Sequence, residues 1–292
     1  MATNAIITSN SLDITRVVIG EIRNNAAGGK TVPIKYNGQN LQTRIPKIFY
    51  PAGVVVREDD KTGSKTYSLL ASLKGCDVMG KDRSTDGSEV GVFYNFLLDL
   101  QEKIIQSATV NSGKWFGKTR SEAVIRETFK PIINLSVEKV SGEWVPNGKY
   151  PPSLRMKIGV WEGKVSLQAV DQEDTELTVT EENMQQIFAK RVDARVVVSP
   201  SIYVTGTGFG VTWRVTMAKV FAATRMTAKQ AFADLKDEDA VAAPAAAPSE
   251  EDATPDEETN EDTPPAPAPS PSFMEPAPAA PAKKTRRVMA AS

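Results

Sequence analysis

Aromatic rings and basic side chains stand next to one another at several places in this sequence, and together they could bind a nucleic acid. Flat rings stack on nucleobases, while Lys and Arg neutralise phosphates. The densest group lies in the segment 111–120, around the neighbouring rings of Trp115 and Phe116. Its basic members are Lys114, Lys118 and Arg120. Because the segment has glycines and no amphipathic period, we expect a surface loop. Two interpretations stay open: the rings stack on bases, or they plug the core beneath the loop.

Similar mixed pairs come from segments that we expect to be β-strands. Arg155 and Lys157 share one face of a predicted strand, and Trp161, an even number of residues further on, would point to the same face. Tyr203 and Arg214 would line the strands beside it. Lys47 and Phe49 form a further pair in a short segment. We therefore expect the remaining base-stacking residues to be Phe49, Trp161 and Tyr203, and the remaining phosphate contacts to be Lys47, Arg155, Lys157 and Arg214.

The absence of certain residue types from the sequence disfavours an enzymatic function. The 292 residues include no His and a single Cys, Cys76. Without imidazole there is no Ser-His-Asp or Cys-His pair, and one Cys cannot build a zinc site or an intramolecular disulfide. Acidic clusters at 58–60 and 171–176 leave open a metal-dependent enzyme that uses carboxylates alone, such as a nuclease, although consecutive carboxylates in turns usually face water. We predict no catalytic residue, no cofactor and no bound metal.

Charge is divided unequally along the chain. The 35 basic and 36 acidic side chains nearly cancel, but residues 237–292 hold 12 of the acidic ones and only 4 of the basic ones. Residues 1–236 therefore carry 31 basic and 24 acidic side chains, a net charge of +7. The same boundary places 11 of the 19 prolines in 237–292. We predict a folded, basic body over 1–236 and a disordered, acidic, Pro/Ala-rich tail over 237–292 that ends in a basic cluster.

A mostly-β framework must position these side chains. Short β-branched segments, bounded by turn residues, predict strands. They cover 32–36, 41–45, 53–57, 66–73, 132–140, 154–161, 164–170, 195–204 and 211–221. Glu162 and Gly163 predict a tight hairpin turn. An apolar stripe from Phe93 to Ile104 predicts a helix, and shorter helices are expected after Ser121 and Thr180.

Three segments resemble a family of single-stranded DNA-binding proteins from large eukaryotic DNA viruses, of the phycodnavirus and mimivirus type. The segments are 93–105 (FYNFLLDLQEKII), 114–118 (KWFGK) and 129–132 (FKPI). That family is similar to bacteriophage single-stranded DNA-binding proteins with an acidic tail. The resemblance implies an OB-fold-like barrel with a few inserted α-helices, whose groove holds the strand. The tail departs from the phage pattern, because here a basic cluster follows the acidic region instead of a terminal aromatic residue.

The leading hypothesis is a non-enzymatic protein that coats single-stranded DNA exposed in replication, recombination or repair. The tail would compete with DNA for the groove or recruit replication proteins, and the sequence is compatible with a homo-oligomer. We find no secretory signal and no apolar run of the roughly 18 residues that span a membrane. We therefore expect an intracellular, soluble protein, in the host nucleus or at a cytoplasmic viral replication site if it is viral. The alternative is a structural virion or assembly protein that does not bind nucleic acid.

Overall fold

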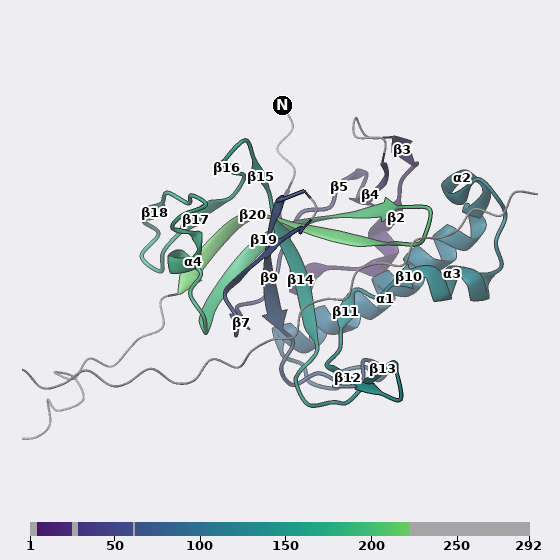
Figure 1. The fold of residues 1–292 in the computed structure, drawn as a ribbon, viewed down its shortest axis with the longest axis horizontal. Coiled ribbons are helices and arrows are strands. Elements are labelled where there is room, and N and C mark those ends of the chain that lie inside the picture. Colours follow the sequence, from purple (N-terminus) through teal and green to yellow (C-terminus); the bar gives the residue numbers. More distant parts are fainter. Residues whose placement is uncertain (1–4, 25–28, 61, 222–292) are drawn as a thin grey trace, which may run out of the picture. The chain divides into compact units, whose positions relative to one another are not determined.

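The protein is described by a computed structural model that covers residues 5–24, 29–60 and 62–221. Strands predominate in these residues and helices are few, which confirms the predicted mostly-β class (Figure 1). Most strands belong to one 16-stranded sheet. Its central strands follow one another in the order β1 (Ile7–Thr8), β6 (Thr43–Arg44), β19 (Val192–Val204), β20 (Phe209–Phe221), β14 (Ser153–Ile158), β9 (Lys65–Ser72) and β8 (Val54–Glu58).

Shorter strands attach to this path or form separate hairpins. The attached strands are β2 (Val17–Ile19), β3 (Arg23–Asn24), β4 (Lys30–Tyr36), β5 (Gln39–Asn40), β7 (Ile48–Tyr50), β10 (Phe129–Lys130), β11 (Ile133–Asn134), β17 (Gln168–Val170) and β18 (Glu176–Leu177). The separate hairpins are β12 (Val137–Val140) with β13 (Glu143–Pro146), and β15 (Val160–Trp161) with β16 (Lys164–Val165). The α-helices are α1 (Glu89–Val110), α2 (Ser112–Phe116), α3 (Glu122–Thr128) and α4 (Met184–Ile187).

The two longest strands, β19 and β20, pair antiparallel, and their alternation decides which side chains face outward. In β20, Trp213 and Val215 are buried whereas Arg214 between them is exposed. This is the period-two pattern of a strand with one buried face. Thr216 has no register partner in β19, because the register moves from the pair Val198–Val215 to the pair Val197–Met217. This β-bulge turns Met217 to the outside, although strict alternation from Trp213 and Val215 would place it on the buried face.

The sheet curls back on itself. β7 pairs with β19 and also lies beside β9, near the far end of the path. The inner side chains of all these strands form one hydrophobic core. The sheet therefore has the curvature that the predicted OB-fold-like barrel requires.

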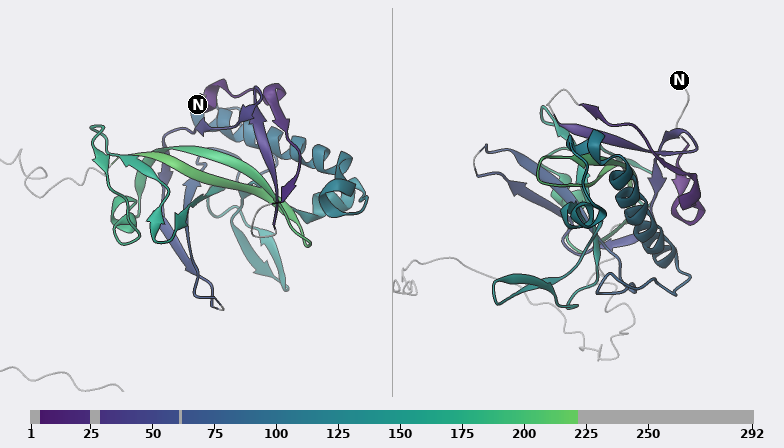
Figure 2. Two further views of the ribbon diagram at one scale, coloured as in Figure 1. Left: turned by 90° about the horizontal axis from the view of Figure 1, so that it is seen from above. Right: turned by 90° about the vertical axis from the view of Figure 1, so that its right-hand side faces the viewer.

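Helix α1 packs against this core alongside the sheet (Figure 2). It begins after Ser88, whose Oγ accepts the backbone N–H of Gly91 at 3.1 Å and so caps the helix. The predicted apolar stripe from Phe93 to Ile104 is buried as expected. Phe93 meets Trp213 edge to face, with 6.5 Å between ring centroids. The helix thus supports the inner side of β20 and leaves its outer side free for other contacts.

Several predicted elements differ from the structure. The segment 111–120 is not a loop throughout, because residues 112–116 form α2 and bury Trp115. The predicted strand 132–140 is divided between β11 and β12, and the predicted strand 154–161 ends at Ile158, with Trp161 in the following hairpin. The helix expected after Thr180 is shorter, since α4 spans only Met184–Ile187. Pairing with different neighbours, which the local sequence does not encode, sets these boundaries.

The predicted tail, 237–292, and the predicted boundary at residue 236 lie outside the described residues and stay predictions. Among the residues that are described, no helix is long and apolar enough to cross a membrane.

Candidate nucleic-acid interface

A groove of about 360 Å³ opens on the outer face of the sheet, where β14 and β20 diverge. The two strands pair only over Met156–Ile158, and at their other ends β20 pairs with β10 and β14 with β11. The short segment that joins β10 to β11 therefore forms a second wall of the groove. The basic residues in the walls are Lys130, Arg155 and Lys157, and the aromatic ones are Tyr203 and the buried Trp213. Arg155, Lys157 and Tyr203 were predicted from the sequence, and the structure brings them together.

The groove is positively charged and lacks a compensating carboxylate in its walls. Its cations form no ion pair with any other described residue. Arg155 donates a hydrogen bond to Oγ of Ser68 at 3.3 Å, which holds the guanidinium in place. Burial lowers the pKa of Arg155, and the neighbouring Arg57 lowers it further. A bound anion would reduce the repulsion between such neighbouring cations.

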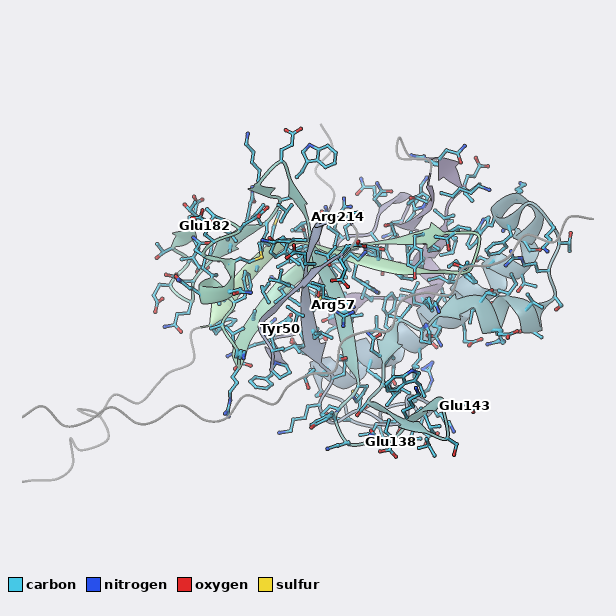
Figure 3. All side chains as sticks on the ribbon, in the orientation of Figure 1. Tyr50, Arg57, Glu138, Glu143, Glu182 and Arg214 are labelled. Carbon is cyan, nitrogen blue, oxygen red and sulfur yellow. The ribbon has the colours of Figure 1, made fainter. Side chains whose placement is uncertain are left out.

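The positive charge extends beyond the groove across neighbouring strands. Arg214 on β20 is the register partner of Lys157 on β14. Arg57 projects from β8, two strands further on, and Figure 3 labels it together with Arg214. We refer to these outward side chains as the cationic face: Arg57, Lys130, Arg155, Lys157 and Arg214. Because they come from four adjacent or closely spaced strands, they could follow an extended polyanion rather than a single phosphate.

Tyr203 depends on a glycine for its position in the groove. It is the register partner of Gly210, which in turn pairs with Lys130. A Cβ added to Gly210 would lie 2.8 Å from the Tyr203 hydroxyl oxygen and 3.0 Å from Cβ of Lys130. The ring therefore occupies the space above Gly210, and its burial there raises the pKa of Tyr203. The Tyr203 side chain is partly exposed, and it lines the groove.

The predicted hairpin at Glu162 and Gly163 is confirmed, and it lifts Trp161 away from the groove walls. Both turn residues have positive φ, 50° and 74°, as in the favoured two-residue hairpin turns. Trp161 is 73% exposed and faces Lys164 across the hairpin. The base of the hairpin lies beside the cationic face, because a Cβ on Gly159 would come within 4.0 Å of Cδ of Arg214.

The group in 111–120 is largely core, contrary to the stacking interpretation. Trp115 is 2% exposed and meets Phe209 edge to face, so the prediction that it stacks on bases is wrong. The physical reason is that the end of the barrel needs large rings to close it. Phe116 is half-buried against Phe209, and the Arg120 guanidinium lies 4.3 Å from its centroid. The two lysines of this group, Lys114 and Lys118, are exposed outside the groove walls.

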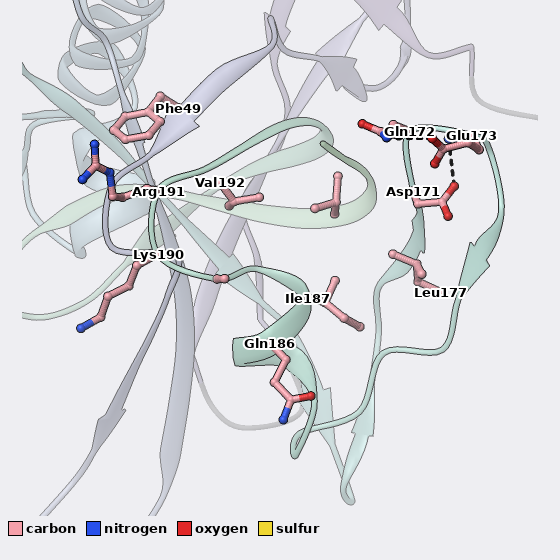
Figure 4. A pocket seen from close by; sticks show the side chains of 12 residues that line it. Phe49, Asp171, Gln172, Glu173, Leu177, Gln186, Ile187, Lys190, Arg191 and Val192 are labelled. Atoms are coloured by element: carbon pink, nitrogen blue, oxygen red, sulfur yellow. Dashed lines mark hydrogen bonds between the residues drawn. The ribbon is translucent and has the colours of Figure 1, made fainter. Parts of the chain in front are cut away.

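Phe49 lies on β7 and Lys47 directly precedes that strand, and neither lines the groove. Lys47 is paired with Asp193 at 4.0 Å and lies 4.2 Å from the centroid of Phe221, so part of its charge is already compensated. Phe49 is 39% exposed and borders a pocket of about 870 Å³ with Arg191 and Ile187 (Figure 4). Asp171 and Glu173 stand on the far side of that pocket. These carboxylates offset the charges of Lys190 and Arg191 in the same pocket, so it is less positive than the groove.

Sequence reasoning missed two cations of the cationic face, Arg57 and Lys130, and two exposed rings outside the groove, Tyr150 and Trp144. Lys130 lies in the segment 129–132, one of the three that carry the family resemblance, but the sequence analysis assigned it no role. Arg57 ends a predicted strand, where alternation could have placed it outward. Tyr150 is 61% exposed in a Pro-flanked segment, and Trp144 is 68% exposed on the β12–β13 hairpin. Exposure of a single ring in a loop or at a hairpin has no periodic signal, so only the structure identifies the last two.

The acidic clusters at 58–60 and 171–176 do not assemble a metal site. Over the described part of the chain, no group of three or more Asp, Glu, Cys or His residues could hold an ion. Asp171 instead accepts hydrogen bonds from the backbone N–H groups of Glu173 and Thr175 at 3.0 and 2.8 Å, which shape a turn. Asp171 is therefore engaged in shaping its own loop.

Comparison with known proteins finds no matching family model and no matching curated protein. Solved structures of bacteriophage proteins are similar at low level. Gp2.5, a single-stranded DNA-binding protein encoded by bacteriophage T7, superposes with a TM-score of 0.36 and 12% identity over 64% of this chain and 96% of that one. The single-stranded DNA-binding protein from bacteriophage Enc34, in complex with ssDNA, gives 0.31 and 12% over 70% and 94%. Its C-terminal truncation gives 0.30 and 12% over 72% and 96%. Similarity at this level assigns no ligand to this chain, and it does not address the resemblance to proteins of large eukaryotic viruses.

Proposed function

We propose that this protein binds single-stranded DNA along the cationic face, without catalysing a reaction. One observation carries the proposal: three cations and a partly exposed tyrosine line a single groove whose walls hold no carboxylate. Neutralising phosphates releases condensed counterions, and stacking on rings is tolerant of sequence. These two forces are the ones that a protein needs to coat a strand of any sequence. Exposed strands of this kind arise in replication, recombination and repair.

The residues that act differ in part from the sequence predictions. Phosphates would be held by Lys130, Arg155, Lys157 and Arg214, and bases would stack on Tyr203 and Trp161. Phe116 and Arg120 contact each other at the end of the barrel, so we assign them no direct role. Lys114 and Lys118 add long-range positive potential, which speeds encounter with a polyanion.

The acidic tail would regulate this binding. Residues 237–292 carry 12 acidic side chains on the same chain as the cationic face. A tethered polyanion acts at an effective concentration of about millimolar, so it competes with weakly bound nucleic acid. Once a strand displaces it, the tail becomes available to replication proteins. Deletion of 237–292 should therefore tighten binding at low salt, and unchanged affinity would remove the competitor role.

The test is an equilibrium titration of fluorescent oligo-dT with the full-length protein at several salt concentrations. The log–log slope should be about −0.7 for each phosphate contacted. In the variant with Arg155→Ala and Lys157→Ala, the slope should become shallower by about 1.4. Duplex DNA and oligo-U of the same length are the comparison ligands. Equal affinity for duplex, or a variant with an unchanged slope, would contradict the proposal, and stronger binding of oligo-U would redirect it to RNA.

The structural or assembly role remains the second candidate because of the β12–β13 hairpin. Val137, Val140, Trp144 and Val145 are all exposed there, and the hairpin pairs with no other strand of the described chain. Exposed apolar groups on an unpaired hairpin are typical of protein contacts. Oligo-dT should quench tryptophan fluorescence if Trp161 stacks on bases, whereas an assembly protein that ignores DNA would show no change.

A further inference from the structure

We propose that a second pocket, beside the cationic face, holds one unpaired nucleobase of the bound strand. The inference rests on the proposed function and adds a subsite to it. The pocket has a volume of about 600 Å³. Its lining includes Phe49 of β7, Leu70 of β9 and Tyr150. We call it the Phe49–Tyr150 pocket.

The walls of the Phe49–Tyr150 pocket suit a flat, apolar ring. Phe49 and Tyr150 are 39% and 61% exposed, so both rings offer a free face to an occupant. Pro51 and Pro151 complete an apolar rim, and the hydroxyl of Ser153 is among the few polar groups. Aromatic rings prefer offset or edge-on contact with another ring, which a nucleobase supplies. A surface of this kind is stabilised when a ring covers it and removes water.

The pocket is continuous with the cationic face through one strand pair. Leu70 in its lining is the register partner of Arg155, and Ser72 is the partner of Ser153. Paired residues on one face of a sheet have Cβ atoms about 5 Å apart. Arg155 therefore stands between the groove and the pocket. A strand whose phosphate contacts Arg155 brings an adjacent base to Leu70.

Charge identifies the occupant. Lys74 lines the pocket, and the Lys149 ammonium lies 5.6 Å from the ring centroid of Tyr150. No carboxylate is present among the lining residues. The occupant should thus combine a flat apolar part with anionic groups on either side, as a nucleotide within a strand does. An aromatic side chain from a protein partner would fill the apolar part and leave the lysines without a counter-charge.

Occupancy of this pocket would discriminate against double-stranded DNA. A base in a duplex is paired and stacked on both faces, so it enters a pocket only after it leaves the helix. A base in a single strand has no such cost. The cationic face alone attracts any polyanion, and the Phe49–Tyr150 pocket would make the protein prefer single strands.

The experiment uses the full-length protein with Phe49→Ala and Tyr150→Ala, and two probes. One probe is oligo-dT, and the other is an oligomer of abasic deoxyribose phosphates of the same length. Loss of both rings should weaken oligo-dT binding about 100-fold, roughly ten-fold for each ring, and leave the abasic oligomer unaffected. Tyr150→Phe, which keeps the ring, should bind as the wild type does. Trp144→Ala is the matched control for loss of an exposed ring elsewhere.

Three results would overturn the inference while the proposed function stands. The first is that Phe49→Ala with Tyr150→Ala leaves oligo-dT affinity unchanged, although Arg155→Ala with Lys157→Ala weakens it. The second is equal weakening for both probes, which would mean damage to the charged face and not loss of a base contact. The third is a change in oligomeric state without DNA, which would make the pocket a protein interface. If neither pair of substitutions affects oligo-dT, the proposed function itself is wrong.

Discussion

The β15–β16 and β12–β13 hairpins are built alike. Each carries one exposed tryptophan that faces a lysine: Trp161 opposite Lys164 and Trp144 opposite Lys139. Each reverses through a non-glycine residue and a glycine that both have positive φ, Glu162 with Gly163 and Ser141 with Gly142. The first hairpin follows β14 in the sequence and the second precedes it.

Their surroundings differ. The β15–β16 hairpin begins beside Arg214 of the cationic face. The β12–β13 hairpin carries Glu138 and Glu143, which Figure 3 shows well away from Arg57 and Arg214, and Trp144 lines an apolar pocket with Leu98 of α1. An exposed ring can stack on a base in either place, but only the first hairpin lies beside Arg214 of the cationic face, whereas Lys139 on the second shares its hairpin with Glu138 and Glu143. Exposure alone therefore does not mark a nucleic-acid site.

Removal of Trp161 together with Arg214 should have the largest effect. Both Trp161→Ala and Arg214→Ala delete a contact to the strand, so we expect oligo-dT affinity to fall about 100-fold at low salt. The salt slope should become shallower by about 0.7, because one phosphate contact is lost. The matched control removes Trp144 and Lys139 from the other hairpin and should bind as the wild type does. Fluorescence anisotropy titrations at several salt concentrations measure both the oligo-dT affinity and the salt slope.

Trp161→Ala alone should weaken oligo-dT binding about ten-fold and leave the salt slope unchanged, since stacking involves no counterions. Trp144→Ala should have no effect on affinity. In proteins that retain a single exposed tryptophan, only Trp161 fluorescence should be quenched by oligo-dT. Equal losses in the two variants would show that the two hairpins bind DNA alike and would break the comparison.

Alanine at the turn glycines should have a smaller effect on binding. Gly142 and Gly163 have φ of 95° and 74°, which a residue with a Cβ adopts at a cost of about 1 kcal/mol. Both Gly142→Ala and Gly163→Ala should lower the free energy of unfolding or fray their hairpins. Only Gly163→Ala should also weaken oligo-dT binding, about two- to three-fold, because it displaces Trp161. Urea unfolding measured alongside anisotropy separates the two effects.

The smallest expected change is a gain. Glu138→Gln with Glu143→Gln removes the carboxylates beside Trp144 without changing side-chain size. Oligo-dT affinity should rise about two-fold at low salt and return to the wild-type value at high salt, because exposed charges are screened. A gain that persists at high salt would mean that Trp144 already contacts the strand.

The sequence predicted the mostly-β class and the exposed face of its longest strands, because alternation is a local signal. It placed Arg155 and Lys157 on one side of a strand and Arg214 on the strand beside it, as the structure has them. Alternation fails at Met217 because a bulge at Thr216 shifts the parity, and nothing in the local pattern marks that bulge.

Ring exposure was harder to predict. Trp115 stands in a basic, Gly-flanked segment and is buried, whereas Trp144 directly follows the acidic Glu143 and is exposed. Burial of Trp115 depends on Phe209, which is almost one hundred residues away in the chain. Such long-range contacts decide which rings close the barrel and which remain for a ligand. For the same reason, no pattern in the sequence indicated that Tyr150 and Phe49 share a pocket.

Strand β14 pairs with β9, β11 and β20, while its alternate side chains belong to the core and to the groove. The groove cannot persist once this strand leaves the sheet. Heat denaturation would then compete directly with binding of an oligonucleotide in the groove. An oligonucleotide at 100 times its dissociation constant would add about 2.7 kcal/mol to the unfolding free energy. A melting curve thus becomes an inexpensive screen that ranks candidate ligands without a label on either molecule.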